Sequence, residues 1–153
     1  MDEIVARSLA KWPNVPAVYG WLSLDRRGNW LIKGEKIGNA ALREFIARNY
    51  EGDERGCWYF QNGPQRVYVS LAYTPLVVHY EGERVVDHRG RAFSPGVALQ
   101  DDEGSVLFEG EGTVALLDDR DLARFADRDQ ELRSIERSSV ASRFGFIADP
   151  KPA

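Results

Sequence analysis

The spacing of the turns constrains this chain more than any single motif does. Between Leu76 and Leu117, short apolar runs such as LVVHY, RVVD and TVALL alternate with turns that carry glycine, among them EGE, RGR and DDEGS. Turns that recur about every eight to twelve residues are typical of antiparallel sheets. The second half of the chain is therefore expected to form a mostly antiparallel β-roll or small barrel.

The first half predicts two hairpins around one helix. Val18–Leu24 and Asn29–Lys33 alternate in polarity on either side of the turn DRRG, which is typical of a hairpin. Asn39 is a suitable N-cap for an amphipathic helix over Ala40–Tyr50, and Gly52 follows as its stop. In this first hairpin, a three-residue loop groups Leu22, Leu24, Trp30 and Ile32 on one face and leaves Tyr19, Trp21, Leu31 and Lys33 on the other.

The stretch CWYFQNGPQRVYVSL, residues 57–71, predicts the second hairpin. With the four residues NGPQ as its loop, Tyr59 faces Tyr68 and Gln61 faces Arg66. Strand alternation then gives one apolar face, made of Trp58, Phe60, Val67, Val69 and Leu71. The opposite face carries Cys57, Tyr59, Gln61, Arg66, Tyr68 and Ser70.

The C-terminal part predicts one further helix and a loosely held end. Asp118 or Asp119 can cap a short helix that reaches Arg128, whereas the residues beyond it are mostly polar. We expect an α+β fold in which strand exceeds helix. Its three parts are a hairpin-helix-hairpin unit at 1–75, a β-rich unit with the short helix at 76–128, and a weakly structured segment at 129–153.

One run of the sequence resembles known bacterial families. Residues 20–46, GWLSLDRRGNWLIKGEKIGNAALREFI, combine a tryptophan-bearing hairpin, a G-x-x-I segment and a helix. This combination resembles the start of families known as domains of unknown function, among them domain of unknown function 1285. The resemblance implies a fold of two small units, a hairpin with helix and sheet followed by a β-roll. It implies no catalytic residue, because these families have none assigned.

Composition excludes several classes of function. A net charge of −4 disfavours nucleic acid and anionic membrane as partners, since both require a clustered positive surface. No apolar run approaches the ~20 residues that cross a bilayer, and the first residues lack the apolar core of a signal peptide, so we expect a cytoplasmic protein. One cysteine and two histidines make a metal site improbable on ligand number, and we expect no cofactor.

The aromatic face of the second hairpin is the strongest candidate for binding. Tyr59, Tyr68 and Arg66, with Gln61 and Trp21, combine flat apolar area with polar groups, a mixture that is enriched at binding hot spots. The same mixture is also found where one subdomain packs on another. The sequence leaves both interpretations open: a surface for an unknown protein or small molecule, or an internal contact.

The sequence supports two functions from different classes. The leading hypothesis is a non-enzymatic interaction or small-ligand-binding domain, because no paired catalytic constellation is present in the sequence. The alternative is a small enzyme acting on a metabolite, in which the fold brings His88 and Asp87 together with Cys57. DHRG is also an ordinary turn sequence, and a strand cysteine is more often simply packed.

Overall fold

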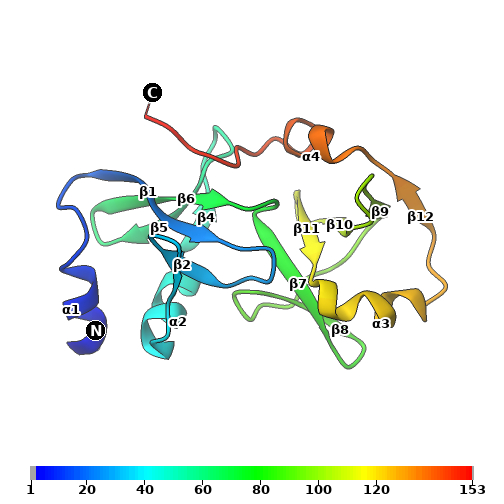
Figure 1. Cartoon of the computed structure of the whole chain (residues 1–153), viewed down its shortest axis with the longest axis horizontal. Helices are drawn as coiled ribbons and strands as arrows, with labels where there is room; N and C mark the ends of the chain where they lie inside the picture. The colour runs from blue at the N-terminus through cyan, green and yellow to red at the C-terminus, as the bar shows by residue number, and fades with distance from the viewer. Residues whose placement is uncertain (1–2, 153) are drawn as a thin grey trace.

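The computed structural model describes residues 3–152, and its first half contains the first of two sheets (Figure 1). In chain order the elements are α1 (Glu3–Leu9), β1 (Ala17–Leu24), β2 (Trp30–Ile32), β3 (Glu35–Lys36), α2 (Ala40–Arg48), β4 (Tyr50–Gly52), β5 (Trp58–Asn62) and β6 (Gln65–Leu71). The strands form a six-stranded sheet in the order β3-β2-β1-β6-β5-β4. The predicted hairpin-helix-hairpin arrangement is therefore confirmed, with α1 as an addition that the sequence did not predict.

The second half contains the other sheet. Its elements are β7 (Leu76–Glu81), β8 (Arg84–Asp87), β9 (Ala98–Gln100), β10 (Val106–Gly110), β11 (Thr113–Leu117), the 3₁₀ helix η1 (Asp119–Asp121), α3 (Leu122–Ala126), β12 (Leu132–Ser134) and α4 (Arg137–Phe144). The strand order is β12-β9-β10-β11-β7-β8, with β12 and β8 at the edges. The fold is α+β as expected, but within residues 3–152 there is no closed barrel, and both sheets mix parallel with antiparallel pairs.

The two sheets share one pattern of connections, which explains why the expected barrel is wrong. Each begins with a strand and its hairpin partner, and later strands return as a meander whose last member lies parallel to the first, as β6 does to β1 and β11 to β7. The parallel pair lies inside each sheet, and each of its strands carries buried apolar residues. Two hairpins extended outward from an inner parallel pair leave two free edges, whereas a barrel requires these edges to pair.

Strand registers in both hairpins agree with the sequence. Leu22 pairs with Ile32 and Leu24 with Trp30 in the first hairpin, and Tyr59 pairs with Tyr68 in the second. The second loop is shorter than expected because Asn62 pairs with Gln65. This leaves a two-residue loop, with Gly63 in the left-handed region.

Helix α2 begins as predicted and ends earlier. The Asn39 side chain accepts a hydrogen bond from the Leu42 N–H at 2.8 Å, which is the expected N-cap. The helix stops at Arg48, and Tyr50 belongs to β4, where it pairs with Phe60. The predicted second helix is present as η1 and α3, with Asp118 accepting from the Arg120 N–H as its cap.

A single hydrophobic core runs through both sheets. Buried side chains of the first sheet, such as Leu24 and Phe60, belong to the same cluster as Leu76 and Leu107 of the second. Val140 of α4 is part of this cluster as well. The division of the chain at residues 75 and 128 stays a prediction.

Four turns of the chain have one design. Each follows the pattern D-x-x-G-x, and they span Asp25–Asn29, Asp53–Cys57, Asp87–Arg91 and Asp101–Ser105. In each, the aspartate Oδ1 accepts backbone N–H groups two and four residues ahead, at 2.8 to 3.3 Å. The glycine has φ between +83° and +87°, which other residues rarely adopt. Partial burial alone would raise the pKa of the Asp25 carboxyl. The hydrogen bonds from Asn29 and Arg27 outweigh this effect and hold that pKa below its usual value.

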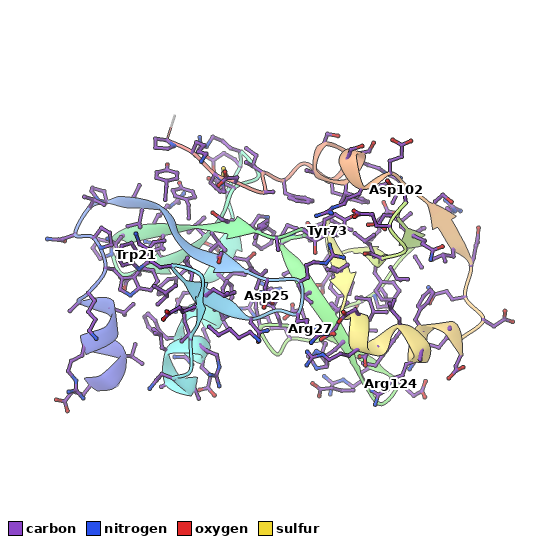
Figure 2. All side chains as sticks on the ribbon, viewed as in Figure 1. Trp21, Asp25, Arg27, Tyr73, Asp102 and Arg124 are labelled. Carbon is purple, nitrogen blue, oxygen red and sulfur yellow. The ribbon has the colours of Figure 1, made fainter. Side chains whose placement is uncertain are left out.

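Three of these turns meet where the two sheets join. A Cβ at Gly28 would lie 2.7 Å from the Cβ of His88, so the turn of Asp25 can approach that of Asp87 only with glycine there. Arg26 of the same turn donates to the Ser105 hydroxyl at 2.6 Å. Figure 2 shows Asp25 and Tyr73 in the middle of the molecule, at this junction. The Tyr73 hydroxyl donates to Asp101 Oδ2 at 2.8 Å.

Removing the Asp101 carboxylate should destabilise the protein. Asp101 is buried and accepts from two turn amides and from Tyr73. We expect Asp101→Ala to lower the free energy of unfolding by about 3 kcal/mol, because three donors lose a charged acceptor. Urea denaturation measures this loss. Asp127→Ala, at an exposed aspartate, is the matched control and should stay within about 0.5 kcal/mol of wild type. An equal loss of unfolding free energy in both variants would contradict a stabilising role of the Asp101 carboxylate.

Candidate functional site

The predicted tyrosine pair lies in a small core of its own. Tyr59, Tyr68 and Cys57 are buried together with Tyr19 packed against them, and we call these four residues the tyrosine cluster. Tyr19 stacks on Tyr68 with ring centres 4.8 Å apart, and the Arg66 guanidinium lies 4.2 Å above the Tyr59 ring. Tyr59 is 5% exposed and Tyr68 is 7% exposed. Little of either ring therefore reaches solvent.

The C-terminal segment lies against the tyrosine cluster. Ile147 forms a parallel bridge with Cys57, and its N–H donates to the Gly56 carbonyl at 2.9 Å. The Ala148 carbonyl accepts from the Leu71 N–H at 2.7 Å. A side chain at Gly56 would collide with the Gly145 carbonyl. These backbone contacts hold residues 145–148 along the first sheet, next to the face that the sequence singled out.

Trp21 and Gln61 are separated from the tyrosine cluster. Val18 pairs with Val67 and Leu22 with Val69, so β1 has two extra residues in this stretch and forms a bulge. Gly20 lies in the bulge and has φ +70°. Because the bulge adds two residues, the alternation of faces is kept, and the Lys33 Nζ lies 4.5 Å from the Trp21 ring centre on the face where the sequence placed both. Trp21 packs against the main core, 6.4 Å from Trp12 between ring centres. Gln61 pairs with Arg66 as expected, but it lines a separate pocket near Arg48. Whether these five predicted residues bind anything stays a prediction.

His88, Asp87 and Cys57 do not form a joint site among the described residues. The His88 Nδ1 accepts from the Val77 N–H at 3.2 Å, and the imidazole lies edge-to-face with Trp30 and Tyr50. The Asp87 carboxylate is occupied by the Arg89 side chain at 2.7 Å and by turn amides. Cys57 belongs to the tyrosine cluster, and burial raises the pKa of its thiol.

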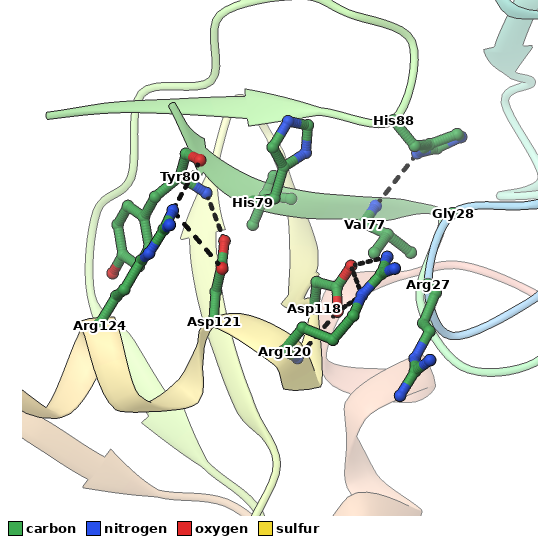
Figure 3. Close-up of a pocket in the computed structure, with 11 residues that line it drawn as sticks. Arg27, Gly28, Val77, His79, Tyr80, His88, Asp118, Arg120, Asp121 and Arg124 are labelled. Carbon is green, nitrogen blue, oxygen red and sulfur yellow. Dashed lines mark hydrogen bonds and ion pairs between the residues drawn. The ribbon is translucent and has the colours of Figure 1, made fainter. Parts of the chain in front are cut away.

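A cleft of about 510 Å³ opens at the junction of the two sheets (Figure 3). We call it the junction cleft. The turn of Asp25 contributes Arg27 and Gly28, and β7 contributes one wall with His79. The lining also includes the η1 cap Asp118, two residues of η1, Arg120 and Asp121, and Arg124 of α3. Segments that are about ninety residues apart in the sequence thus share one polar space.

Ion pairs balance the charge of the junction cleft. They are Arg27–Asp119 at 2.9 Å, Arg120–Asp118 at 2.6 Å and Arg124–Asp121 at 3.8 Å. Burial alone would raise the pKa of Asp118, but the Arg120 guanidinium and N–H hold that pKa below its usual range. Arg124 is the least engaged of the three arginines: its side chain is 63% exposed and its Nη1 lies 3.5 Å from the Tyr80 carbonyl.

The sequence predicts a helix N-terminus at the acidic run DDRDLAR, residues 118–124, but it does not predict the cleft. The Asp118 cap confirms that part of the interpretation. The arginines were visible in DRRG and in DDRDLAR, but nothing local indicates that the two runs face each other. Their approach depends on the contact between Gly28 and His88, which is a tertiary feature.

The described residues offer no cluster of metal ligands. No group of three or more histidine, cysteine, aspartate or glutamate side chains within residues 3–152 could hold a metal ion. In the same part of the chain, no helix has the length and apolar character needed to cross a bilayer.

Comparison with known proteins gives a family and a fold. The sequence matches the family described as "Protein of unknown function (DUF2946)" over residues 1–151. No curated protein matches it.

Two solved structures of DUF1285 family proteins are similar in fold. The one from Silicibacter pomeroyi DSS-3 has a TM-score of 0.56 and 18% identity, over 83% of this chain and 84% of that chain. The one from Shewanella baltica OS155 has a TM-score of 0.54 and 16% identity, over 70% of this chain and 91% of that chain. These matches confirm the resemblance seen in residues 20–46, and at such identities they show the fold alone.

Acid should weaken the junction through His88. Burial lowers the pKa of His88 from its ordinary 6.5 to about 4, so the unfolded chain takes up a proton before the folded one does as the pH falls. Stability from the neutral imidazole is present above pH 6.5 and is lost as the pH falls towards 4. Between pH 7 and pH 5 this predicts a loss of about 2 kcal/mol in the free energy of unfolding.

Urea denaturation at several pH values measures that loss, and His88→Asn is the comparison variant. The asparagine Oδ1 can still accept from the Val77 N–H, but it does not titrate. The variant should show a flatter dependence on pH over this range. An unchanged slope would mean that other groups cause the acid loss.

Thiol labelling should report on the docking of the C-terminal segment. Cys57 is buried and its neighbour in the bridge is Ile147, so wild type should react slowly with a thiol reagent. Ile147→Pro removes the N–H that bonds Gly56 and should speed labelling about tenfold by favouring local opening. Ile147→Ala keeps that N–H and should label at nearly the wild-type rate. Similar rates for all three proteins would show that the segment does not protect Cys57.

Proposed function

Because the chain belongs to the family of proteins of unknown function DUF2946, we propose its function from geometry: it is a non-enzymatic domain that binds a small polar molecule in the junction cleft. The observation that carries the proposal is that three arginines, which come from both sheets, line one space. Arg27 comes from the first sheet, while Arg120 and Arg124 come from the end of the second. Residues from two structural units around one cavity are a common arrangement for ligand sites.

The charge balance of the cleft favours a ligand with a single carboxylate over a polyanion. Each of the three arginines has a carboxylate partner, so the net positive charge of the cleft is small. Arg124 is held most loosely, at 3.8 Å from Asp121, and is the best placed to pair with a ligand carboxylate. A volume of about 510 Å³ suits a metabolite rather than a folded partner.

The state of the acid–base groups supports a non-enzymatic role. His88 accepts a backbone N–H and Asp87 is saturated by Arg89, so neither is poised for proton transfer. His79 lines the cleft, but its Nε2 is engaged with Glu81 at 2.9 Å. These contacts favour the binding hypothesis over the histidine and aspartate enzyme.

The tyrosine cluster remains the second predicted binding region. Arg66 is half-buried over the Tyr59 ring, and Gln61, half-buried as well, pairs with Arg66 from the separate pocket that it lines. Tyr59, Tyr68 and Trp21 are proposed to support that region from beneath, because most of their area is packed.

Arg124→Ala tests the proposed function. We expect wild type to gain thermal stability with at least one member of a panel of amino acids and small organic acids, and the variant to lose that gain. Arg133→Ala is the matched control, since Arg133 is 62% exposed and forms a similar exposed ion pair with Glu131. It should keep the gain. The proposal fails if no member of the panel stabilises wild type, or if Arg124→Ala responds as wild type does.

A further inference from the structure

A second polar pocket lies between the end of α2 and the turn of Asp87. Its volume is about 450 Å³. It is lined by Arg48, Asn49, Tyr50, Glu51, Gln61, Arg89 and Arg91. We call it the arginine pocket. It shares no lining residue with the junction cleft, so its side chains can be changed without altering the lining of that cleft.

Arg89 forms a rigid wall of this pocket. Its Nη2 and Nε both donate to Asp87 Oδ2, at 2.7 and 3.2 Å. The Asp87 side chain is fully buried and that of Arg89 is 12% exposed. A buried, doubly bonded guanidinium of this kind is pre-organised and loses little freedom when a ligand binds.

Arg48 and Arg91 differ from the arginines of the junction cleft because neither has a carboxylate partner within residues 3–152. Arg91 Nη2 makes one long hydrogen bond, of 3.4 Å, to the Arg48 carbonyl. The Arg48 guanidinium lies 6.0 Å from the Phe45 ring centre. Two uncompensated guanidiniums at one pocket form an unusual local excess of positive charge in a chain of net charge −4.

The other residues of the arginine pocket reduce its positive charge but do not neutralise it. Glu51 is the carboxylate that lines the pocket, and its Oε1 accepts from the Tyr59 hydroxyl at 2.7 Å. With Asp87 matched to Arg89, one carboxylate faces two guanidiniums. Gln61 donates through Nε2 to the Gly63 and Gln65 carbonyls, which leaves its Oε1 to accept from a ligand hydroxyl.

An adjoining groove provides room for more than an isolated anion. It has a volume of about 430 Å³ and shares Arg48 and Arg89 with the arginine pocket. Ala47 and Gly90 line it, so part of its wall carries little side chain. An organic group attached to the anion can extend along this groove.

We propose that the arginine pocket binds the phosphate of a small phosphate monoester, with Arg48 and Arg91 as the pairing groups and Arg89 as the fixed wall. Guanidinium groups bind phosphate oxygens through paired N–H donors, and a phosphate dianion has enough charge for two of them. A carboxylate carries one charge and two oxygens, so it matches this pair less well. The neighbouring groove receives the alcohol part of the ester.

Calorimetric titration with glycerol 3-phosphate, inorganic phosphate and glycerol tests the proposal. Wild type should bind glycerol 3-phosphate more tightly than inorganic phosphate, and glycerol not at all. Arg91→Ala and Arg48→Ala should each weaken binding of the ester about tenfold or more, as expected when a charge-assisted pair is lost. Arg91→Lys should recover part of the affinity, because it keeps the charge but loses the paired donors.

Arg84→Ala is the control, since Arg84 is an exposed arginine on β8 outside the pocket. It should bind the ester as wild type does, whereas an equal loss would show a diffuse effect of net charge and overturn the site. Equal affinity for phosphate and its ester would overturn the assignment of a monoester. Absence of binding by wild type, or full binding by Arg91→Ala and Arg48→Ala, would overturn the proposal as a whole. Arg124→Ala should leave ester binding intact, which separates this result from that for the junction cleft.

Discussion

Carboxylates that satisfy the amides of their own turns hold the two sheets of this protein in position. Because one aspartate accepts two N–H groups of a D-x-x-G-x turn, each turn keeps its shape without support from its neighbours. Preformed turns can then meet as rigid surfaces, as Gly28 does with His88 and Arg26 with Ser105. The turn of Asp53 receives the C-terminal segment in a similar way. The relative position of the sheets therefore depends on short polar contacts as well as on the shared core.

The same turns distribute the arginines between two pockets of different charge. In the junction cleft, the run DDRDLAR supplies a carboxylate for each guanidinium, including that of Arg27. In the turn DHRGR, the single aspartate, Asp87, forms an ion pair with Arg89, and the run contains no second carboxylate for Arg91. The balance of acids and arginines within each short run thus sets the chemistry that each pocket favours. On this basis we propose a ligand with a single carboxylate for the first pocket and a phosphate dianion for the second.

Local features of the fold could be predicted from the sequence, and long-range ones could not. The register of Tyr59 with Tyr68 and the N-cap at Asn39 follow from alternation and side-chain chemistry, which act over a few residues. The parallel pairing of β1 with β6 joins segments far apart, and no local pattern encodes it. For that reason the small barrel, one of the two forms expected for the second half, is wrong. The sequence grouped Trp21 with Lys33 on one face, and their contact agrees with that, whereas the packing of Trp21 against Trp12 depends on how the segment before β1 returns to the sheet. Of the residues that line the two pockets, the sequence singled out Gln61 of the arginine pocket and, for the enzyme alternative, His88 of the junction cleft.

The parallel pair inside each sheet has a consequence for the order of folding. β1 finds its parallel partner only when β6 is available, and β7 only when β11 is, so each sheet closes its parallel pair only after a later strand has been made. Such closure carries a larger entropy cost than a hairpin and is expected to be slow. During synthesis the first sheet can form once β6 has left the ribosome, whereas residues 145–148 reach Cys57 and Leu71 only after nearly the whole chain has been made. Residues 145–148 thus cover Cys57 last, and in a chain halted before residue 145 the Cys57 thiol would stay accessible to thiol reagents on an already formed first sheet.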